Sequence, residues 1–276
     1  YNISNLQMKI ILNKKKLFHF IKNEKNLGFV PTMGAIHKGH ISLVKKSIQL
    51  CNKTIVSIFI NKPQFNKKSD FKKYPRKLDH DIRLLKDSGV DFLYIPSFKQ
   101  IYPAKVNKKI KIDSFKKKLC GQFRPGHFEA VADVIDRFIK LINPNKIFFG
   151  NKDMQQLKII ESFIRNNYPR IKVIGCKTIR EKNGVAYSSR NILLSSKEKN
   201  TASKIYKSIF SKKNLIIKKK ISLSTVKSEI LKIGANKIDY LKIFDLNKIV
   251  KPYRKKIILK IFIAYYLGKT RLIDNI

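Results

Sequence analysis

The fold is decided by one stretch near the start of the chain, Leu27-Gly28-Phe29-Val30-Pro31-Thr32-Met33-Gly34-Ala35-Ile36-His37-Lys38-Gly39-His40. Its first four residues form an apolar run that ends at a proline, which predicts a short buried strand. A glycine-containing turn follows, and apolar residues then recur at helical spacing, at Ile41, Val44, Ile48 and Cys51. The stretch therefore predicts a strand, a tight turn and a helix in that order.

The same alternation continues to about residue 177. Further strands are expected at 54–60, 92–96, 146–150 and 171–174, and further helices at 78–85, 128–142 and 157–164. We interpret Lys108–Ile112 as a hairpin or edge strand, and Asp153 with Gln156 as a capping box. Alternating strands and helices indicate βαβ units, so we expect an α/β fold with a doubly wound, mainly parallel, Rossmann-like sheet over residues 1–177. Ligands bind such sheets at the carboxyl ends of the strands.

The pattern changes after Lys177. Helices are expected at 202–210 and 225–233, and strands at 237–244 and 256–266, with a turn at Gly268. We therefore expect a second, smaller α+β domain over residues 178–276. No Pro-, Gly- or Ser-rich linker separates the two parts, which predicts that they pack closely.

The composition indicates a strongly basic surface. The 276 residues carry a formal charge of +43, but only 10 of the 61 basic residues are arginine, the usual residue for bidentate phosphate contacts. The lysines are spread over the whole length, so we favour solvated lysines over a dedicated nucleic-acid patch and do not expect a nucleic-acid partner.

Other classes of protein are disfavoured. The three cysteines are widely spaced and form no CxxC pair, so neither a disulfide framework nor a zinc site is expected. The longest apolar stretch, Ile257–Leu267, is far shorter than the ~20 residues of a membrane-spanning helix. The N-terminal residues show no signal-peptide pattern, and we expect a cytoplasmic location without a membrane partner.

His37 and His40 carry the strongest chemical signal. Histidines three apart at a helix start lie on one face, and a helix N-terminus offers free N–H groups to a phosphate. Gly39 lets the backbone approach closely. We favour nucleotide binding, while a metal pair or two surface histidines stays open.

Four other polar stretches fall in predicted turns, and each alone is also compatible with an ordinary loop or helix start. They are Tyr187-Ser188-Ser189-Arg190, Gly150-Asn151-Lys152-Asp153-Met154-Gln155-Gln156, Asn61-Lys62-Pro63-Gln64-Phe65 and Arg124-Pro125-Gly126-His127-Phe128. Hydroxyl, guanidinium and ammonium groups suit phosphate oxygens, and an amide suits a hydroxy acid.

Taken in order, these stretches resemble the pantothenate synthetase family, the pantoate–β-alanine ligases of the HxGH nucleotidyl transferase superfamily. The resemblance extends over almost the whole chain. It is carried by 31–40, 57–61, Gln64-Phe65, 74–76, 124–128, Phe149-Gly150, Lys152-Asp153, 155–157, Arg180-Glu181, 188–191 and Arg271-Leu272-Ile273-Asp274-Asn275.

The resemblance implies an ATP-dependent ligase that makes pantothenate, AMP and pyrophosphate through a pantoyl adenylate. It makes His40 the catalytic histidine, with His37 beside it on the phosphates. It implies ATP contacts from Met33, Gly34, Ala35, Ile36, His37, Lys38, Gly39, His40, Gly150, Asn151, Lys152, Asp153, Ile179, Tyr187, Ser188, Ser189 and Arg190. Substrate contacts would come from Gln64, Gln156, Asn61 and Arg124, with Gln64 also meeting β-alanine. Mg²⁺ would bridge the phosphates, and a homodimer is expected.

Several positions depart from the family pattern. Lys62 stands where the family has proline, Asn151 where glutamate is usual, Asn183 where aspartate is usual, and Tyr187 where methionine is usual. The segment Glu129-Ala130-Val131-Ala132-Asp133 also differs from the family's usual continuation.

Two rival hypotheses remain at the level of sequence. One is another HxGH-type nucleotidyl transferase, whose use for Gln64 and Gln156 is not evident. The other is a non-catalytic protein that binds RNA or a membrane surface through its lysines, which predicts strongly salt-dependent binding and no need for His37 or His40.

Overall fold

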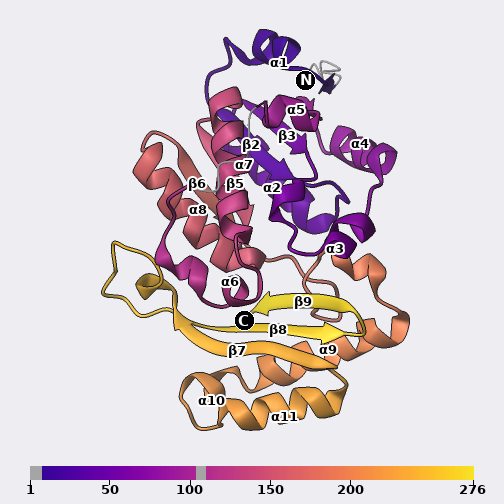
Figure 1. The fold of residues 1–276 in the computed structure, drawn as a ribbon, viewed down its shortest axis with the longest axis vertical. Coiled ribbons are helices and arrows are strands. Elements are labelled where there is room, and N and C mark those ends of the chain that lie inside the picture. Colours follow the sequence, from indigo (N-terminus) through magenta and orange to yellow (C-terminus); the bar gives the residue numbers. More distant parts are fainter. Residues whose placement is uncertain (1–7, 104–109) are drawn as a thin grey trace.

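The computed structural model describes residues 8–103 and 110–276, which form two β-sheets with helices around them (Figure 1). The larger sheet has six parallel strands in the order β1-β4-β3-β2-β5-β6. Its strands are β1 Lys9–Ile11, β2 Leu27–Thr32, β3 Lys53–Ile58, β4 Phe92–Tyr94, β5 Lys146–Gly150 and β6 Lys172–Cys176. The expected doubly wound Rossmann-like sheet is confirmed.

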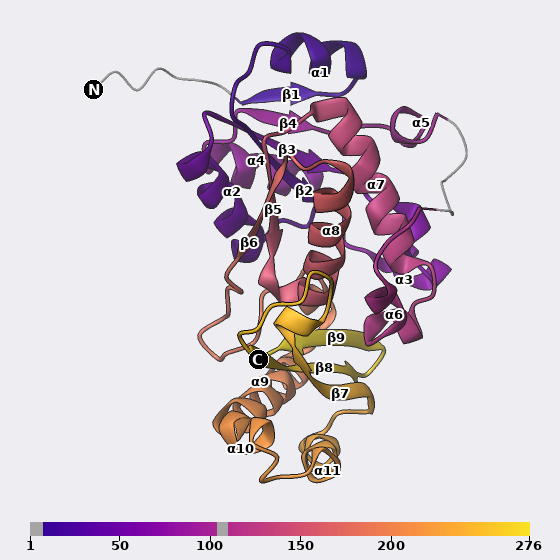
Figure 2. The same cartoon turned by 90° about the vertical axis from the view of Figure 1, so that its left-hand side faces the viewer.

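Helices cover both faces of this sheet (Figure 2). Alternate residues of β2 show why: Phe29 belongs to the core under α7 and α8, whereas Val30 belongs to the core under α2 and α4. The long helices are α1 Lys14–Ile21, α2 Lys38–Leu50, α4 Leu78–Asp87, α7 His127–Ile142 and α8 Met154–Asn167. Shorter ones are α3 Lys68–Lys73, α5 Phe98–Ile101 and α6 Cys120–Phe123, with 3₁₀ turns at Lys62–Gln64, Ser114–Lys117 and Asn151–Asp153.

The C-terminal part is a three-stranded antiparallel sheet, β7-β8-β9, with helices beyond it (Figure 1). Its elements are α9 Ser196–Ser211, α10 Lys213–Ile217, α11 Leu223–Ile233, β7 Lys237–Asp245, β8 Leu259–Leu267 and β9 Thr270–Asn275, with 3₁₀ turns at Ser189–Leu193 and Leu246–Lys248. One face of this sheet packs on α9 and α11 through Leu241 and Ile263. The other face joins the main core through Tyr240 and Phe262, so the two parts pack closely, as expected.

Several local predictions were wrong or incomplete. Strand β1, helix α1 and strand β9 were not predicted, because none has a long periodic apolar pattern. Asp153 precedes α8 but makes no capping hydrogen bond, so the predicted capping box is absent there. A capping box does form at Ser195 and Glu198 on α9. Of Lys108–Ile112, residues 108 and 109 lie outside the described residues, and 110–112 form no strand.

No helix within residues 8–103 and 110–276 combines the length and apolar character that crossing a bilayer requires.

Candidate active site

A cavity of about 1030 Å³ lies between the carboxyl ends of the parallel strands and the β7–β9 sheet. Most of the residues singled out from the sequence line it: Met33, His37, Gly39, His40, Asn61, Gln64, Arg124, Gly150, Lys152, Asp153, Gln156, Ile179, Tyr187, Ser188, Ser189 and Arg190. Five others do not line it, namely Gly34, Ala35, Ile36, Lys38 and Asn151. Segments separated by more than a hundred residues therefore meet in one space.

The Asp81 carboxylate holds the turn after β2 through hydrogen bonds to its backbone. Gly34 and Ala35 have φ values of 77° and 50°. Both values lie in the left-handed region, which residues adopt mainly in tight turns. The backbone N–H groups of Ala35 and Ile36 donate to Asp81 at 2.8 and 2.7 Å. Burial raises the pKa of Asp81, and these two hydrogen bonds oppose that shift. Asp81 was missed from the sequence because it lies on an ordinary amphipathic helix, α4.

His37 and His40 stack face to face, with ring centroids 4.0 Å apart. The Nδ1 atom of His37 accepts a hydrogen bond from the Gly39 N–H at 3.1 Å, which caps α2. A neutral His37 therefore carries its proton on Nε2. A side chain on Gly39 would place its Cβ 2.9 Å from the His37 ring, so the turn requires glycine there.

Both imidazoles are held neutral. Burial, with Lys152 nearby, lowers the pKa of His37 to about 4. Burial also lowers the pKa of His40 well below its ordinary value, and His37 and Lys152 add to the effect. Among residues 8–103 and 110–276, the buried Nδ1 atom of His40 has no hydrogen-bond partner, while the His40 side chain lines the cavity.

The Tyr187–Arg190 segment is attached to the same turn. The Tyr187 ring lies 6.1 Å from the His37 ring, nearly parallel to it. The Ser189 hydroxyl donates to the Ala35 carbonyl at 3.3 Å. Arg190 is held by the Asp70 carboxylate on α3 at 2.9 Å. At this position, where methionine is usual in the family, the chain therefore has a flat aromatic ring that faces the His37 ring.

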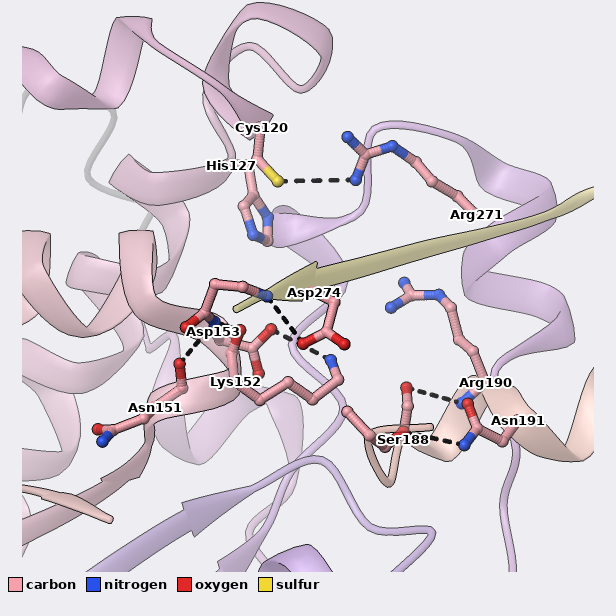
Figure 3. Close-up of polar contacts among 12 residues, drawn as sticks. Cys120, His127, Asn151, Lys152, Asp153, Ser188, Arg190, Asn191, Arg271 and Asp274 are labelled. Carbon is pink, nitrogen blue, oxygen red and sulfur yellow. Dashed lines mark hydrogen bonds and ion pairs between the residues drawn. The ribbon is translucent and has the colours of Figure 1, made fainter. Parts of the chain in front are cut away.

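The C-terminal strand supports the turn between β5 and α8 (Figure 3). The Asn275 side-chain amide donates to the Asn151 and Lys152 carbonyls, each at 2.8 Å. Its neighbour Asp274 accepts two hydrogen bonds from Arg180, at 2.6 and 2.9 Å. The sequence resemblance included these residues, but it assigned them no role. In this structure Asn275 holds the backbone of Lys152 directly.

Asn61 positions Gln64 rather than facing the cavity freely. Its Nδ2 donates to the Gln64 Oε1 at 3.0 Å and to the Ala130 carbonyl at 3.1 Å. Its Oδ1 accepts from the Tyr102 hydroxyl at 2.8 Å, so both ends of the buried amide are used. Lys62, which stands where the family has proline, is the first residue of the 3₁₀ turn Lys62–Gln64.

The adjacent residues Gln155 and Gln156 have different roles. Gln155 is buried, accepts from the Cys120 N–H at 3.0 Å and donates to the Phe115 and Lys118 carbonyls. It therefore holds the segment before α6, while the neighbouring Gln156 lines the cavity.

Arg124 and His127 are joined to the Gln64 backbone. The His127 Nδ1 contacts the Gln64 carbonyl at 2.8 Å, which requires Nδ1 to carry the proton. Its Nε2 then accepts from Arg124 at 3.0 Å, and Arg124 also donates to the Gln64 carbonyl at 3.2 Å. Burial, with Arg124 beside it, lowers the pKa of His127 well below its usual range and keeps the ring neutral.

One wall of the cavity was not recognised from the sequence as a group, although Arg271 is among the residues that carry the family resemblance. Cys120 and Tyr240 contact each other at 3.0 Å, and Arg271 reaches the Cys120 sulfur at 3.6 Å (Figure 3). Arg271 is itself paired with the buried Asp239 at 2.7 Å. These residues lie far apart in the sequence, and no local spacing marks them as a group.

Comparisons with known proteins agree with this geometry. Residues 6–276 match the family model described as pantoate-beta-alanine ligase. The chain belongs to the pantoate–β-alanine ligase family. A pantothenate synthetase of Clostridium botulinum (strain Loch Maree / Type A3) is 39% identical, with 97% of this chain and 98% of the relative covered. The activity is therefore the ligation of pantoate and β-alanine that forms pantothenate.

Solved structures of pantothenate synthetases share the fold. The enzyme from Thermus thermophilus superposes with a TM-score of 0.88 at 30% identity, covering 98% of this chain and 99% of that one. The pantoate-beta-alanine ligase from Francisella tularensis, solved in complex with beta-gamma ATP and beta-alanine, has a TM-score of 0.83 at 35% identity, covering 98% and 97%. The alternative of a different nucleotidyl transferase is thereby set aside.

Proposed function

We propose that the chain joins pantoate to β-alanine in two steps, through a pantoyl adenylate. In the first step a pantoate carboxylate oxygen attacks the α-phosphorus of ATP, and the bond to pyrophosphate breaks. In the second step the amine of β-alanine attacks the acyl carbon, and AMP leaves. One observation carries the proposal: the neutral histidine pair with Lys152 lines the same cavity as Gln64 and Gln156.

The histidine end suits the triphosphate. The Nε2–H of His37 and the ammonium of Lys152 are donors to phosphate oxygens as charge moves onto the leaving pyrophosphate. His40, which lines the cavity and stacks on His37, contacts the reacting phosphate and is the catalytic residue. ATP would also contact Met33, Gly39, Gly150, Asp153, Ile179, Tyr187, Ser188, Ser189 and Arg190, which line the cavity, while Gly34, Ala35, Ile36, Lys38 and Asn151 shape its turns.

The amide end suits pantoate. Gln64 and Gln156 present amide groups that hydrogen-bond a carboxylate and hydroxyls, and Gln64 also meets β-alanine. Asn61 fixes the Gln64 side chain, and Arg124 fixes the Gln64 backbone. The bound relative from Francisella tularensis supports ATP and β-alanine as ligands of this cavity.

Mg²⁺ would enter with ATP. The Asp153 carboxylate lines the cavity, is nearly half exposed, and pairs with Lys152 only at 3.5 Å. One carboxylate together with phosphate oxygens and water is a usual environment for this ion, so the residues fit it. Bound there, Mg²⁺ supplies charge neutralisation of the phosphates.

Three further proposals concern the whole chain. We place the boundary between the two domains at residues 177 and 178, because β6 ends at Cys176. We propose a homodimer and a cytoplasmic location, as the family resemblance implies, and light scattering tests the dimer. We propose that the lysines serve solvation rather than a nucleic acid, which predicts weak polyanion binding at physiological salt. A salt titration with RNA tests this last proposal.

The deciding experiment separates the two steps. Pantoate-dependent exchange of labelled pyrophosphate into ATP, measured with Mg²⁺ and without β-alanine, should occur if an adenylate forms. AMP and pantothenate should require all three substrates. Pantothenate formation without any pyrophosphate exchange would contradict the adenylate, while leaving the overall ligation intact.

A further inference from the structure

A line of hydrogen bonds leads from the buried Tyr102 to Gln64 at the wall of the cavity. The Tyr102 hydroxyl donates to the Asn61 Oδ1 at 2.8 Å, and the Asn61 Nδ2 donates to the Gln64 Oε1 at 3.0 Å. At the far end of the line, the Gln64 Nε2 donates to the Met33 sulfur at 3.1 Å. Tyr102 directly follows α5 and is not among the residues that line the cavity, so it can influence a ligand there only through Asn61.

The surroundings fix the direction of each hydrogen bond in this line. The Asn61 Nδ2 also donates to the Ala130 carbonyl at 3.1 Å, and a carbonyl can only accept, so the amide nitrogen must lie on that side. The Asn61 oxygen therefore faces Tyr102, whose hydroxyl is the donor. Burial raises the pKa of Tyr102, so the phenol keeps the proton that it donates. Because Asn61 donates to the Gln64 oxygen, the Gln64 nitrogen points away from Asn61.

The Tyr102 hydroxyl has little freedom to move. Its ring stacks on Phe98 with centroids 4.8 Å apart, and the Arg137 guanidinium carbon lies 4.5 Å from its centroid. Arg137 is itself paired with Asp133 at 2.9 Å. Tyr102 is 5% exposed and Asn61 is 1% exposed, so both are enclosed by the core. The orientation of the Gln64 amide is therefore imposed by packed side chains that a ligand does not touch.

The Gln64 nitrogen keeps the capacity to donate to a ligand. An amide nitrogen carries two donor hydrogens, and a thioether sulfur is a weak acceptor, so an oxygen atom can replace the Met33 contact. Gln64 lines the cavity together with Gln156. Under the proposed function this end holds pantoate, whose carboxylate and hydroxyl oxygens accept hydrogen bonds. A Gln64 amide turned the other way would place its own oxygen against them, and two acceptors repel.

We propose that Tyr102 is a positioning residue for pantoate, which through Asn61 directs the Nε2–H groups of Gln64 toward a pantoate oxygen. The identity of the ligand rests on the proposed function, whereas the role of Tyr102 rests on the directions of the hydrogen bonds. Tyr102 is 41 residues from Asn61 in the sequence, so no local spacing links the two.

The test removes one oxygen atom from the line. Tyr102→Phe keeps the ring that contacts Phe98 and Arg137, but it leaves the Asn61 Oδ1 without this donor. Calorimetry measures pantoate binding in the presence of Mg²⁺ and α,β-methylene-ATP, an analogue that cannot transfer its AMP group. The dissociation constant for pantoate should rise about 3- to 10-fold, the size of one lost hydrogen bond. The affinity for the ATP analogue should change by less than about twofold, because its site is separate from the line.

Tyr94→Phe is the matched control. Tyr94 belongs to the same buried core as Tyr102, and its hydroxyl donates to the Gln100 Oε1 at 3.3 Å instead of to a residue of the cavity. This variant loses the same atom and should bind pantoate as the unmodified protein does. Circular dichroism and thermal unfolding verify that each variant is folded.

A second measurement asks whether Tyr102 acts through Gln64. In a Gln64→Ala protein the last link of the line is gone, so adding Tyr102→Phe should change pantoate affinity by less than about twofold. An equal fold loss in the two backgrounds would overturn the proposal, because Tyr102 would then act by another route.

Two further results would also overturn it: unchanged pantoate affinity in the folded Tyr102→Phe protein, and an equal loss of affinity for the ATP analogue. Asn61→Ala breaks the line one link later and should weaken pantoate binding at least as much. This variant decides the question if Tyr102→Phe does not fold, and unchanged pantoate affinity in it would sink the idea. The binding measurement needs no turnover. A failure of the adenylate mechanism, seen as absent pyrophosphate exchange in the unmodified protein, therefore remains distinguishable from a failure of this inference.

Discussion

The two ends of the cavity are built in different ways. At the histidine end, His37, Gly39 and His40 come from one turn, and burial holds the imidazoles of His37 and His40 neutral. The arginine end consists of Arg124, Arg190 and Arg271, which line the cavity from three distant segments of the chain. Arg190 is paired with Asp70, and Arg271 is paired with Asp239. The comparison teaches that a neutral donor site can be encoded locally, whereas a charged subsite needs partners that only the tertiary fold brings together.

The largest effect is expected from a substitution at the histidine end. His40→Ala removes the imidazole that meets the reacting phosphate, and the turnover should fall about 100- to 1000-fold, the usual cost of one transition-state donor. Pyrophosphate exchange should fall by the same factor, because the loss lies in the first step. His80→Ala, an exposed histidine on α4, is the matched control. A His40→Ala protein with undiminished exchange would remove this residue from the mechanism.

The next prediction concerns Asp81, which holds the turn of the histidine end. Asp81→Ala leaves the Ala35 and Ile36 N–H groups buried without acceptors, so the free energy of unfolding should fall by about 2–4 kcal/mol. The KM for ATP should rise in parallel, because the turn loses its shape. Urea unfolding of Asp81→Ala and of the exposed Asp79→Ala control measures the difference. Equal stability of the two variants would contradict this support role.

A smaller effect is expected where the C-terminal strand meets the phosphate end. Asn275→Ala removes two hydrogen bonds to the Asn151 and Lys152 carbonyls, so Lys152 should be positioned less well. The KM for ATP should rise about 5- to 20-fold, with a smaller change for β-alanine. Asn200→Ala, exposed on α9, is the control. An unchanged KM for ATP in the folded Asn275→Ala protein would contradict this positioning role.

The smallest expected effect is a pH dependence of the free energy of unfolding, which tests whether His37 is neutral in the folded protein. Both His37 and an unfolded histidine are neutral above pH 6.5, and below that only the unfolded chain binds the proton until about pH 4. The unfolded state therefore binds more protons in this window, and the free energy of unfolding falls as the pH drops from 6.5 to about 4. His37→Gln should flatten part of that slope in urea unfolding curves. An identical slope in the variant would show that His37 titrates normally.

Local sequence predicted much of the fold because its signals act over short range. The apolar runs at 27–30 and 146–150 lie where strands form, since a continuous apolar run fits a parallel strand that is buried on both faces. Short elements such as β1, β9 and α1 escaped prediction, because their stability comes from packing rather than from a periodic pattern. The Asp153 capping box failed for a related reason: the 3₁₀ turn before α8 directs that side chain into the cavity.

The sequence by itself determined the HxGH turn, because a glycine, a capping histidine and a helix start are neighbours in the chain. It also indicated the amide and serine–arginine segments by their order. Only the tertiary structure decided that Asn61 holds Gln64, that Asp81 holds the turn, and that Arg271 faces the cavity beside Cys120. The physical reason is that burial, desolvation and charge pairing depend on which distant segments meet, and residue spacing carries no such information.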